Sequence, residues 1–277
     1  MATRRPPMPD AQSPEIVAAM RQIDRLIRLV GEPVTITSTQ VEPRELHNWD
    51  LVAPAMLFSA ASCLLSLRYL AEAPAPRRDQ DASVLLRRLY EHAVDFAWIA
   101  IDPGTNAPRW VADDFYYRLK LDDDFVQLGR GALSADKRQS YQAYVDAHRG
   151  LPQVLQRAEA ADRYWSTRIE QHGTFPQVAA PDGQDLAQTQ NGRWSLRAAY
   201  AFIYRAGSAI AHPTPSSLFD YVWPGGASGT FTIGMNTGAV NRYAYTMAPL
   251  IFAPMLLIAE QVLGRPKAND VYAAFGT

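Results

Sequence analysis

The segment SLRAAYAFIYRAGSAIAH, residues 195–212, constrains the fold more than any other stretch of the chain. At 3.6 residues per turn its large apolar side chains form one stripe, and small or apolar residues occupy most of the opposite side. Pro213 follows directly, and proline ends a helix because it has no backbone N–H to continue the hydrogen bonding. The pattern therefore predicts a helix that is packed on two sides within an α-helical core.

Three polar residues of this segment, Arg205, Ser208 and His212, fall on one side of the predicted helix. Buried polar groups need partners, because leaving them without hydrogen bonds in a core costs free energy. These three side chains are therefore the first candidates for a functional site.

The rest of the chain repeats apolar residues at helical spacing, with prolines and glycines between the repeats. Residues 1–12 are expected to form a disordered tail, and residues 13–277 a single helical domain. We expect an all-α fold, a bundle of seven or eight helices with one irregular glycine-rich insertion near 213–238. Within that insertion residues 231–233 are expected to form a short strand or one arm of a hairpin, and residues 173–193 a long polar loop. The expected helices cover residues 14–30, 50–73, 81–103, 108–128, 134–148, 152–171, 195–212 and 239–263. The helix at 81–103 carries an apolar stripe, and the helix at 239–263 is apolar on almost all sides, which predicts that it lies inside the bundle. The charged helices at 134–148 and 152–171 are expected to be exposed, and Asp122, Asp123 and Asp124 to form a solvated patch.

Charge and cysteine content exclude several classes of protein. The formal net charge of −1 provides no broad field for nucleic acid or an acidic membrane. The single cysteine, Cys63, permits no intrachain disulfide and fits a reducing cytoplasm, so no disulfide-linked partner is expected. The uncharged runs at 51–67 and 246–259 are shorter than the roughly 20 apolar residues that cross a bilayer, so core helices and a cytoplasmic protein without a membrane are expected.

A polar face on the helix expected at 81–103 gives the second set of candidates. Arg88, Glu91, His92 and Asp95 recur at i, i+3, i+4 and i+7. They fit a solvated face with salt bridges, a set of cation ligands, or partners for Arg205 and His212 inside the bundle. The Glu-x-x-His pairs of di-iron bundles are absent from the sequence, so neither a metal nor another cofactor is expected.

Arg205 and His212 are seven residues apart, which places them on one side of a helix about 10 Å apart. This Arg-x(4–6)-His spacing resembles that of the HEPN ribonuclease superfamily, and Arg87 and His92 form a second pair with an allowed spacing. The resemblance implies that two such helices meet across a dimer, that the histidine transfers a proton at the 2′-hydroxyl, and that the arginine stabilises charge on the scissile phosphate without a metal. Spacing alone also matches by chance, and Ala206 stands where the superfamily favours a polar residue. The structural alternative is that His212 caps a helix and Arg205 pairs with a carboxylate.

A longer resemblance rests on the blocks LLRRLYEHAVDFAWIAIDP and YRAGSAIAHPTPSSL. They resemble an uncharacterised bacterial all-helical family that carries only a domain-of-unknown-function label (DUF5677-like). The matching positions, within about residues 50–265, are Arg87 or Arg88, Glu91, Asp102-Pro103, Ser208 and His212. The resemblance implies that the Glu91 helix and the His212 helix contribute to one constellation.

The leading functional prediction is a metal-independent HEPN-like ribonuclease, a toxin or anti-phage effector that acts on RNA as a homodimer. The alternative prediction is a non-catalytic helical scaffold or small-ligand-binding protein whose buried polar cluster is structural. The candidate catalytic residues, expected to form that buried cluster, are Arg205, His212, Ser208, Glu91, Arg88 and Asp95.

Overall fold

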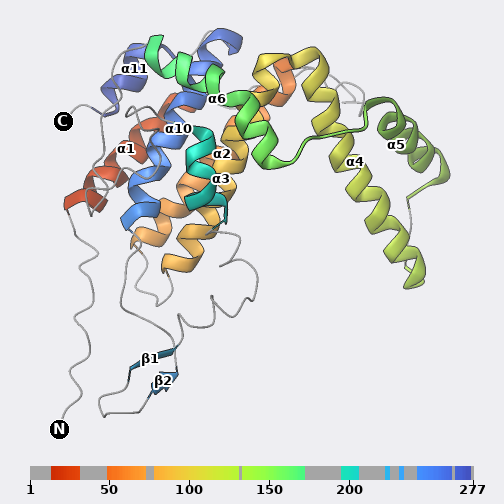
Figure 1. The fold of residues 1–277 in the computed structure, drawn as a ribbon, viewed down its shortest axis with the longest axis horizontal. Helices are drawn as coiled ribbons and strands as arrows, with labels where there is room; N and C mark the ends of the chain where they lie inside the picture. The colour runs from red at the N-terminus through yellow and green to blue at the C-terminus, as the bar shows by residue number, and fades with distance from the viewer. Residues whose placement is uncertain are drawn as a thin grey trace.

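The protein folds as an all-α bundle from which one helical hairpin projects (Figure 1). The bundle contains α1 (Pro14–Val30), α2 (Trp49–Glu72), α3 (Arg78–Ile101), α6 (Val154–Gln171) and α10 (Arg242–Leu263). The short helices α7 (Leu196–Ala199), η2 (Tyr200–Arg205) and α11 (Ala268–Ala273) complete it. The computed structural model describes residues 14–31, 49–72, 78–130, 133–171, 195–205, 222–224, 231–233, 242–263 and 266–275.

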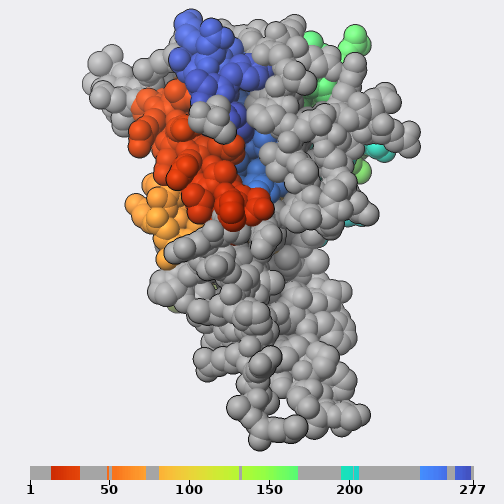
Figure 2. Space-filling model, turned by 90° about the vertical axis from the view of Figure 1, so that its left-hand side faces the viewer, coloured from red at the N-terminus to blue at the C-terminus, as the bar shows by residue number. Residues whose placement is uncertain are grey.

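Helices α3 and α10 form the centre of the bundle. From Ala244 to Ala259 almost every side chain of α10 is buried, which confirms the prediction from its all-round apolar surface. The predicted apolar stripe of α3 is also confirmed, with Leu89, Phe96 and Ile99 fully buried. Helix α1 packs on α10 as an amphipathic helix that ends at Gly31, whose φ of 81° suits glycine. Figure 2 shows α1 lying beside the C-terminal helices on one face of the molecule.

Helix α2 confirms the helix expected over residues 50–73, and it extends beyond the uncharged run at 51–67. Residues Val52–Glu72 are long and apolar enough to cross a membrane by length and composition, and 56% of the most apolar window is buried inside the protein. The helix packs against α3, α1 and α10, and Ala53, Ala60, Leu64 and Leu67 are fully buried. These contacts are those of a core helix.

The projecting hairpin consists of α4 (Pro103–Gln127) and α5 (Ala135–His148). Helix α4 begins five residues before the predicted start, because Asp102 caps it by accepting a hydrogen bond from the Thr105 N–H and Pro103 occupies the first turn. The hairpin has a small core of its own, built from Val111, Phe115, Leu119, Tyr141 and Val145.

Two expectations about surface helices are wrong. Asp122 is buried rather than solvated, because it accepts hydrogen bonds from the Leu133 N–H and from the Arg138 guanidinium of α5. Helix α6 is not an exposed helix, because Ala158, Ala161 and Trp165 are buried against the bundle. Contacts between helices therefore bury residues of both segments that the sequence pattern assigned to the solvent-exposed surface.

The segment expected as one helix over 195–212 differs from the prediction in its described part. An α-helical turn, α7, passes at Tyr200 into the π-helical turns of η2. Leu196, Ala199 and Ile203 are buried, but Arg197, Ala201 and Arg205 are exposed, so this element packs on one side only. Residues 206–212 lie outside the described residues.

Of the insertion near 213–238, the described part is an antiparallel ribbon of β1 (Val222–Pro224) and β2 (Phe231–Ile233). The prediction of a short strand at 231–233 is confirmed. The expected tail at 1–12 and the polar loop at 173–193 lie outside the described residues.

Candidate functional site

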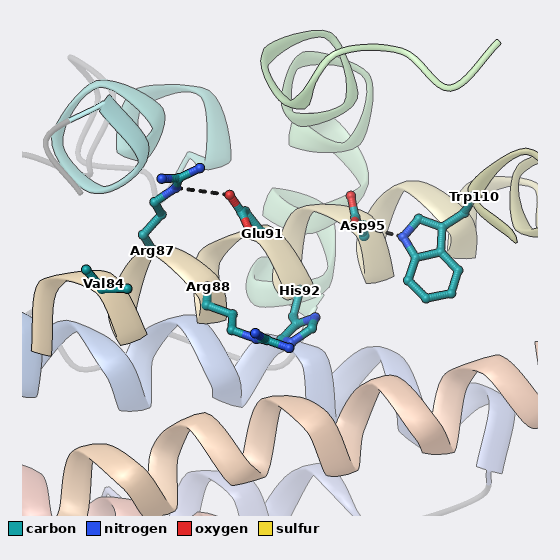
Figure 3. A pocket seen from close by; sticks show the side chains of 7 residues that line it. All are labelled: Val84, Arg87, Arg88, Glu91, His92, Asp95 and Trp110. Atoms are coloured by element: carbon teal, nitrogen blue, oxygen red, sulfur yellow. Dashed lines mark hydrogen bonds and ion pairs between the residues drawn. The ribbon is translucent and has the colours of Figure 1, made fainter. Parts of the chain in front are cut away.

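One face of α3 forms the wall of an open pocket of about 330 Å³. The α3 residues that line it recur at helical spacing and end beside Trp110 of α4 (Figure 3). They include the polar face that the sequence predicted, together with Arg87 and, at one end, the apolar residue Val84. The lining residues are Val84, Arg87, Arg88, Glu91, His92, Asp95 and Trp110.

Arg87 connects the pocket to η2. Its Nε donates a hydrogen bond to Oε1 of Glu91 at 3.1 Å, one turn further along α3. Its guanidinium also lies 4.7 Å from the centroid of the Tyr204 ring, a cation–π contact with η2. Tyr204 in turn stacks on Tyr200 with 4.9 Å between ring centroids. One guanidinium therefore has both an acidic and an aromatic partner.

A hydrogen bond in the core joins α3 to α7, the turn that leads into η2. The Tyr90 hydroxyl of α3 donates to the Leu196 carbonyl oxygen at 2.6 Å, and burial raises the pKa of Tyr90, which keeps it protonated. At the start of α7, Ser195 accepts a hydrogen bond from the Ala198 N–H and donates to Asp162 of α6 at 2.9 Å. The position of α7 relative to α3 is thus set by buried polar contacts.

Asp95 forms a buried junction of three helices. Its Oδ1 accepts from Nε of Arg157 in α6 at 2.7 Å, and its Oδ2 accepts from Nε1 of Trp110 in α4 at 2.9 Å. Arg157 also donates to the Pro152 carbonyl. Burial raises the pKa of Asp95, while the charge of Arg157 and the two hydrogen bonds act in the opposite direction. The arrangement fixes one end of the pocket.

His92 lines the pocket and also contacts α2. Its Nε2 lies 3.1 Å from Oγ of Ser59, a hydrogen bond whose donor depends on the imidazole tautomer. Burial, with a smaller contribution from the charge of Arg88, lowers the pKa of His92 to about 4. His92 is therefore neutral at pH 7. Burial raises the pKa of the neighbouring Cys63 thiol, against the opposing charge of Arg88.

The expected buried cluster of six residues is only partly present. Asp95 is buried and Glu91 half-buried, but Arg88 and Arg205 are exposed, so the expectation of burial is wrong for both arginines. Ser208 and His212 lie outside the described residues.

The ion-pair partners of Asp95 and Glu91 also differ from the expected ones among the described residues. Asp95 pairs with Arg157 rather than with Arg205, and Glu91 pairs with Arg87 on its own helix. The i, i+4 spacing of Arg87 and Glu91 favours this local pair, and a fully buried carboxylate is matched by a cation that is buried as well. The described part of the second segment, residues 195–205, lies against α3 through the Tyr90 and Arg87 contacts.

Several residues of the site were not predicted from the sequence, namely Arg157, Trp110, Ser59 and Tyr204. Arg157 lies on a helix that was expected to be exposed, and it is 62 residues from its acidic partner. Among the residues that the structure describes, no group of three or more histidine, cysteine, aspartate or glutamate side chains is placed to hold a metal ion.

Comparison with protein families identifies one family that matches this sequence. The model of a family of unknown function, DUF5677, matches residues 55–228, more than half of the chain. The chain belongs to the DUF5677 family. Comparison with curated proteins and with solved structures gives no significant match. The DUF5677 match runs from within α2 to beyond β1, so it contains every residue that lines the pocket.

Proposed function

We propose that this DUF5677 protein is a metal-independent, HEPN-like ribonuclease whose catalytic residues lie on the segment that begins with α7. The observation that carries the proposal is the contact between Arg87 and Tyr204, which puts a pocket lined by two arginines beside the element that bears Arg205. Arginine binds phosphate through its planar fork of donors, so arginines on both elements suit a phosphodiester strand.

The local geometry of Arg205 supports this role. Its exposure leaves the guanidinium accessible to a substrate. The π-helical turns of η2 are a second support, because π-type turns occur frequently at functional sites. Ser208 and His212 follow three and seven residues after Arg205 in the sequence.

In the proposed reaction His212 takes the proton of a ribose 2′-hydroxyl, and the 2′-oxygen attacks the adjacent phosphorus. The bond from phosphorus to the 5′-oxygen breaks, the leaving oxygen takes up a proton, and a 2′,3′-cyclic phosphate remains. Arg205 stabilises the charge that develops on the phosphate oxygens. A pair of such sites in a homodimer and a role as a toxin or anti-phage effector belong to the same proposal.

The test is cleavage of a broad RNA panel by purified protein in EDTA. Wild type is expected to yield 2′,3′-cyclic phosphate ends, and His212→Ala to lose about 10²–10⁴-fold in rate, the usual contribution of a general acid or base. Arg205→Ala is expected to lose activity, whereas Arg197→Ala is expected to keep it. Arg197 is the matched control, because it is an exposed arginine two turns earlier that pairs with Glu159. Inert wild type, or His212→Ala as active as wild type, contradicts the proposal.

A second candidate is a non-catalytic protein that binds a small ligand in the pocket. The pocket volume, which lies within the range of small-molecule sites, favours it. This candidate predicts that His212→Ala changes the melting temperature and nothing else.

A further inference from the structure

The pocket contains one cation without an acidic partner. Arg87 is paired with Glu91, and Asp95 is paired with Arg157 of α6. Arg88 remains, and within the described part of the chain no carboxylate forms an ion pair with it. The paired charges cancel, so the pocket carries one uncompensated positive charge on an exposed, accessible side chain.

The groups next to Arg88 are polar and neutral. His92 lies one turn further along α3, and Figure 3 shows the Arg88 guanidinium and the His92 ring close together on the same side of α3. Ser59 of α2 holds the imidazole through the 3.1 Å hydrogen bond. The imidazole is therefore fixed beside a cation that opposes its protonation.

We propose that this pocket binds a phosphate group, with Arg88 as its anchor and the His92 imidazole as the second ligand. A tetrahedral phosphate has enough oxygens to accept two hydrogen bonds from the Arg88 fork and a further one from His92. A carboxylate has only two oxygens, so a phosphate offers more acceptor positions to the guanidinium fork and the imidazole together. The site consists of residues other than Arg205 and His212, and this proposal does not depend on RNA cleavage.

Phosphate binding has a signature that a merely structural Arg88 would not produce. The bound anion offsets the charge of Arg88 and stabilises the imidazolium, so the pKa of His92 rises on binding. The charged and titratable groups that lie around His92 among the described residues are Arg88, Glu91 and Asp95 of α3 and Cys63 of α2. Glu91 is paired with Arg87, and Asp95 is paired with Arg157. A rise in the pKa of His92 during the titration is therefore attributed to the bound anion.

The experiment follows the His92 side-chain NMR signals of the full-length protein during titration with inorganic phosphate, with sodium chloride at equal ionic strength as the reference. Wild type is expected to show a saturable shift and a higher His92 pKa at saturation. Arg88→Gln is expected to weaken binding at least tenfold. Arg21→Gln, which removes an exposed arginine of α1 far along the chain, is expected to bind like wild type. Circular dichroism of both variants checks the fold.

The absence of a saturable shift beyond that of chloride overturns the proposal, as does wild-type affinity in Arg88→Gln. A parallel titration with adenosine 5′-monophosphate identifies the source of the phosphate group. Tighter binding of the monoester indicates a phosphate carried by a larger ligand, and equal binding indicates the free anion. Neither titration measures cleavage, so this proposal and the proposed ribonuclease can fail separately.

Discussion

The environment of His92 predicts a loss of stability in mildly acidic solution. In the unfolded chain this imidazole titrates near the ordinary histidine pKa of 6.5, whereas in the fold its pKa is about 4. Between these values the unfolded state binds a proton that the folded state does not. The free energy of unfolding therefore falls as the pH drops from about 6.5 toward 4, and above pH 6.5 this group makes no pH-dependent contribution.

The size of the effect follows from the difference between the two pKa values. At 1.36 kcal/mol for each pKa unit, His92 contributes about 3 kcal/mol in full, of which about 2–3 kcal/mol is lost by pH 4.5. Asp95 acts with the opposite sign, because its pKa is raised in the fold and its protonation favours the folded state as the pH falls. The contribution of His92 must therefore be isolated by a variant.

The assay is urea unfolding of wild type and His92→Gln between pH 7.5 and pH 4.5, followed by circular dichroism. Wild type is expected to lose about 2–3 kcal/mol more than the variant over this range. Ser59→Ala keeps both the burial of His92 and the charge of Arg88, so it is expected to retain the loss. Arg88→Gln removes the charge that lowers the pKa of His92 and is expected to reduce the loss. Parallel stability curves for wild type and His92→Gln, or an imidazole that titrates near pH 6.5 in the folded protein, would refute the reasoning.

Three further predictions concern stability and thiol chemistry. Arg157→Met leaves the buried Asp95 carboxylate without its cation and is expected to cost about 3–5 kcal/mol in urea unfolding, with part recovered in the Asp95→Asn/Arg157→Met double variant; no recovery contradicts the pairing. Tyr90→Phe removes the hydrogen bond to the Leu196 carbonyl and is expected to cost about 1 kcal/mol by thermal unfolding; an unchanged midpoint would show that the bond is not formed. Cys63 is buried with a raised pKa, so a disulfide reagent is expected to react slowly with it in native protein and quickly in urea, and equal rates would exclude its burial.

The sequence allowed most of the bundle to be predicted, because the helices depend on local signals. The cap at Ser134, the glycine at Gly31 and the apolar repeat of α10 each lie within the element that they define. The DP turn at Asp102 was visible too, but its role as the cap of the next helix, with Pro103 in the first turn, moved the start of α4 earlier than the aromatic residues indicated.

The site was harder to predict, because its contacts join residues that are distant in the sequence. The helical period put Glu91 and Asp95 on one face, but it contained no information that the cation for Asp95 comes from α6. The change from α-helix to π-helix at Tyr200 alters which side chains face the core, and a pattern based on 3.6 residues per turn assigned Arg205 to the interior for that reason. Contacts between distant helices, rather than local helix propensity, determine the partner of Asp95 and the exposure of Arg205.

The α4–α5 hairpin is connected to the pocket through the Trp110 side chain. The hairpin has a small hydrophobic core of its own. It joins the bundle near Trp110, whose indole N–H donates a hydrogen bond to Asp95. Trp110 packs against the core of the bundle and against the core of the hairpin. One side chain thus joins the projecting hairpin to the wall of the pocket.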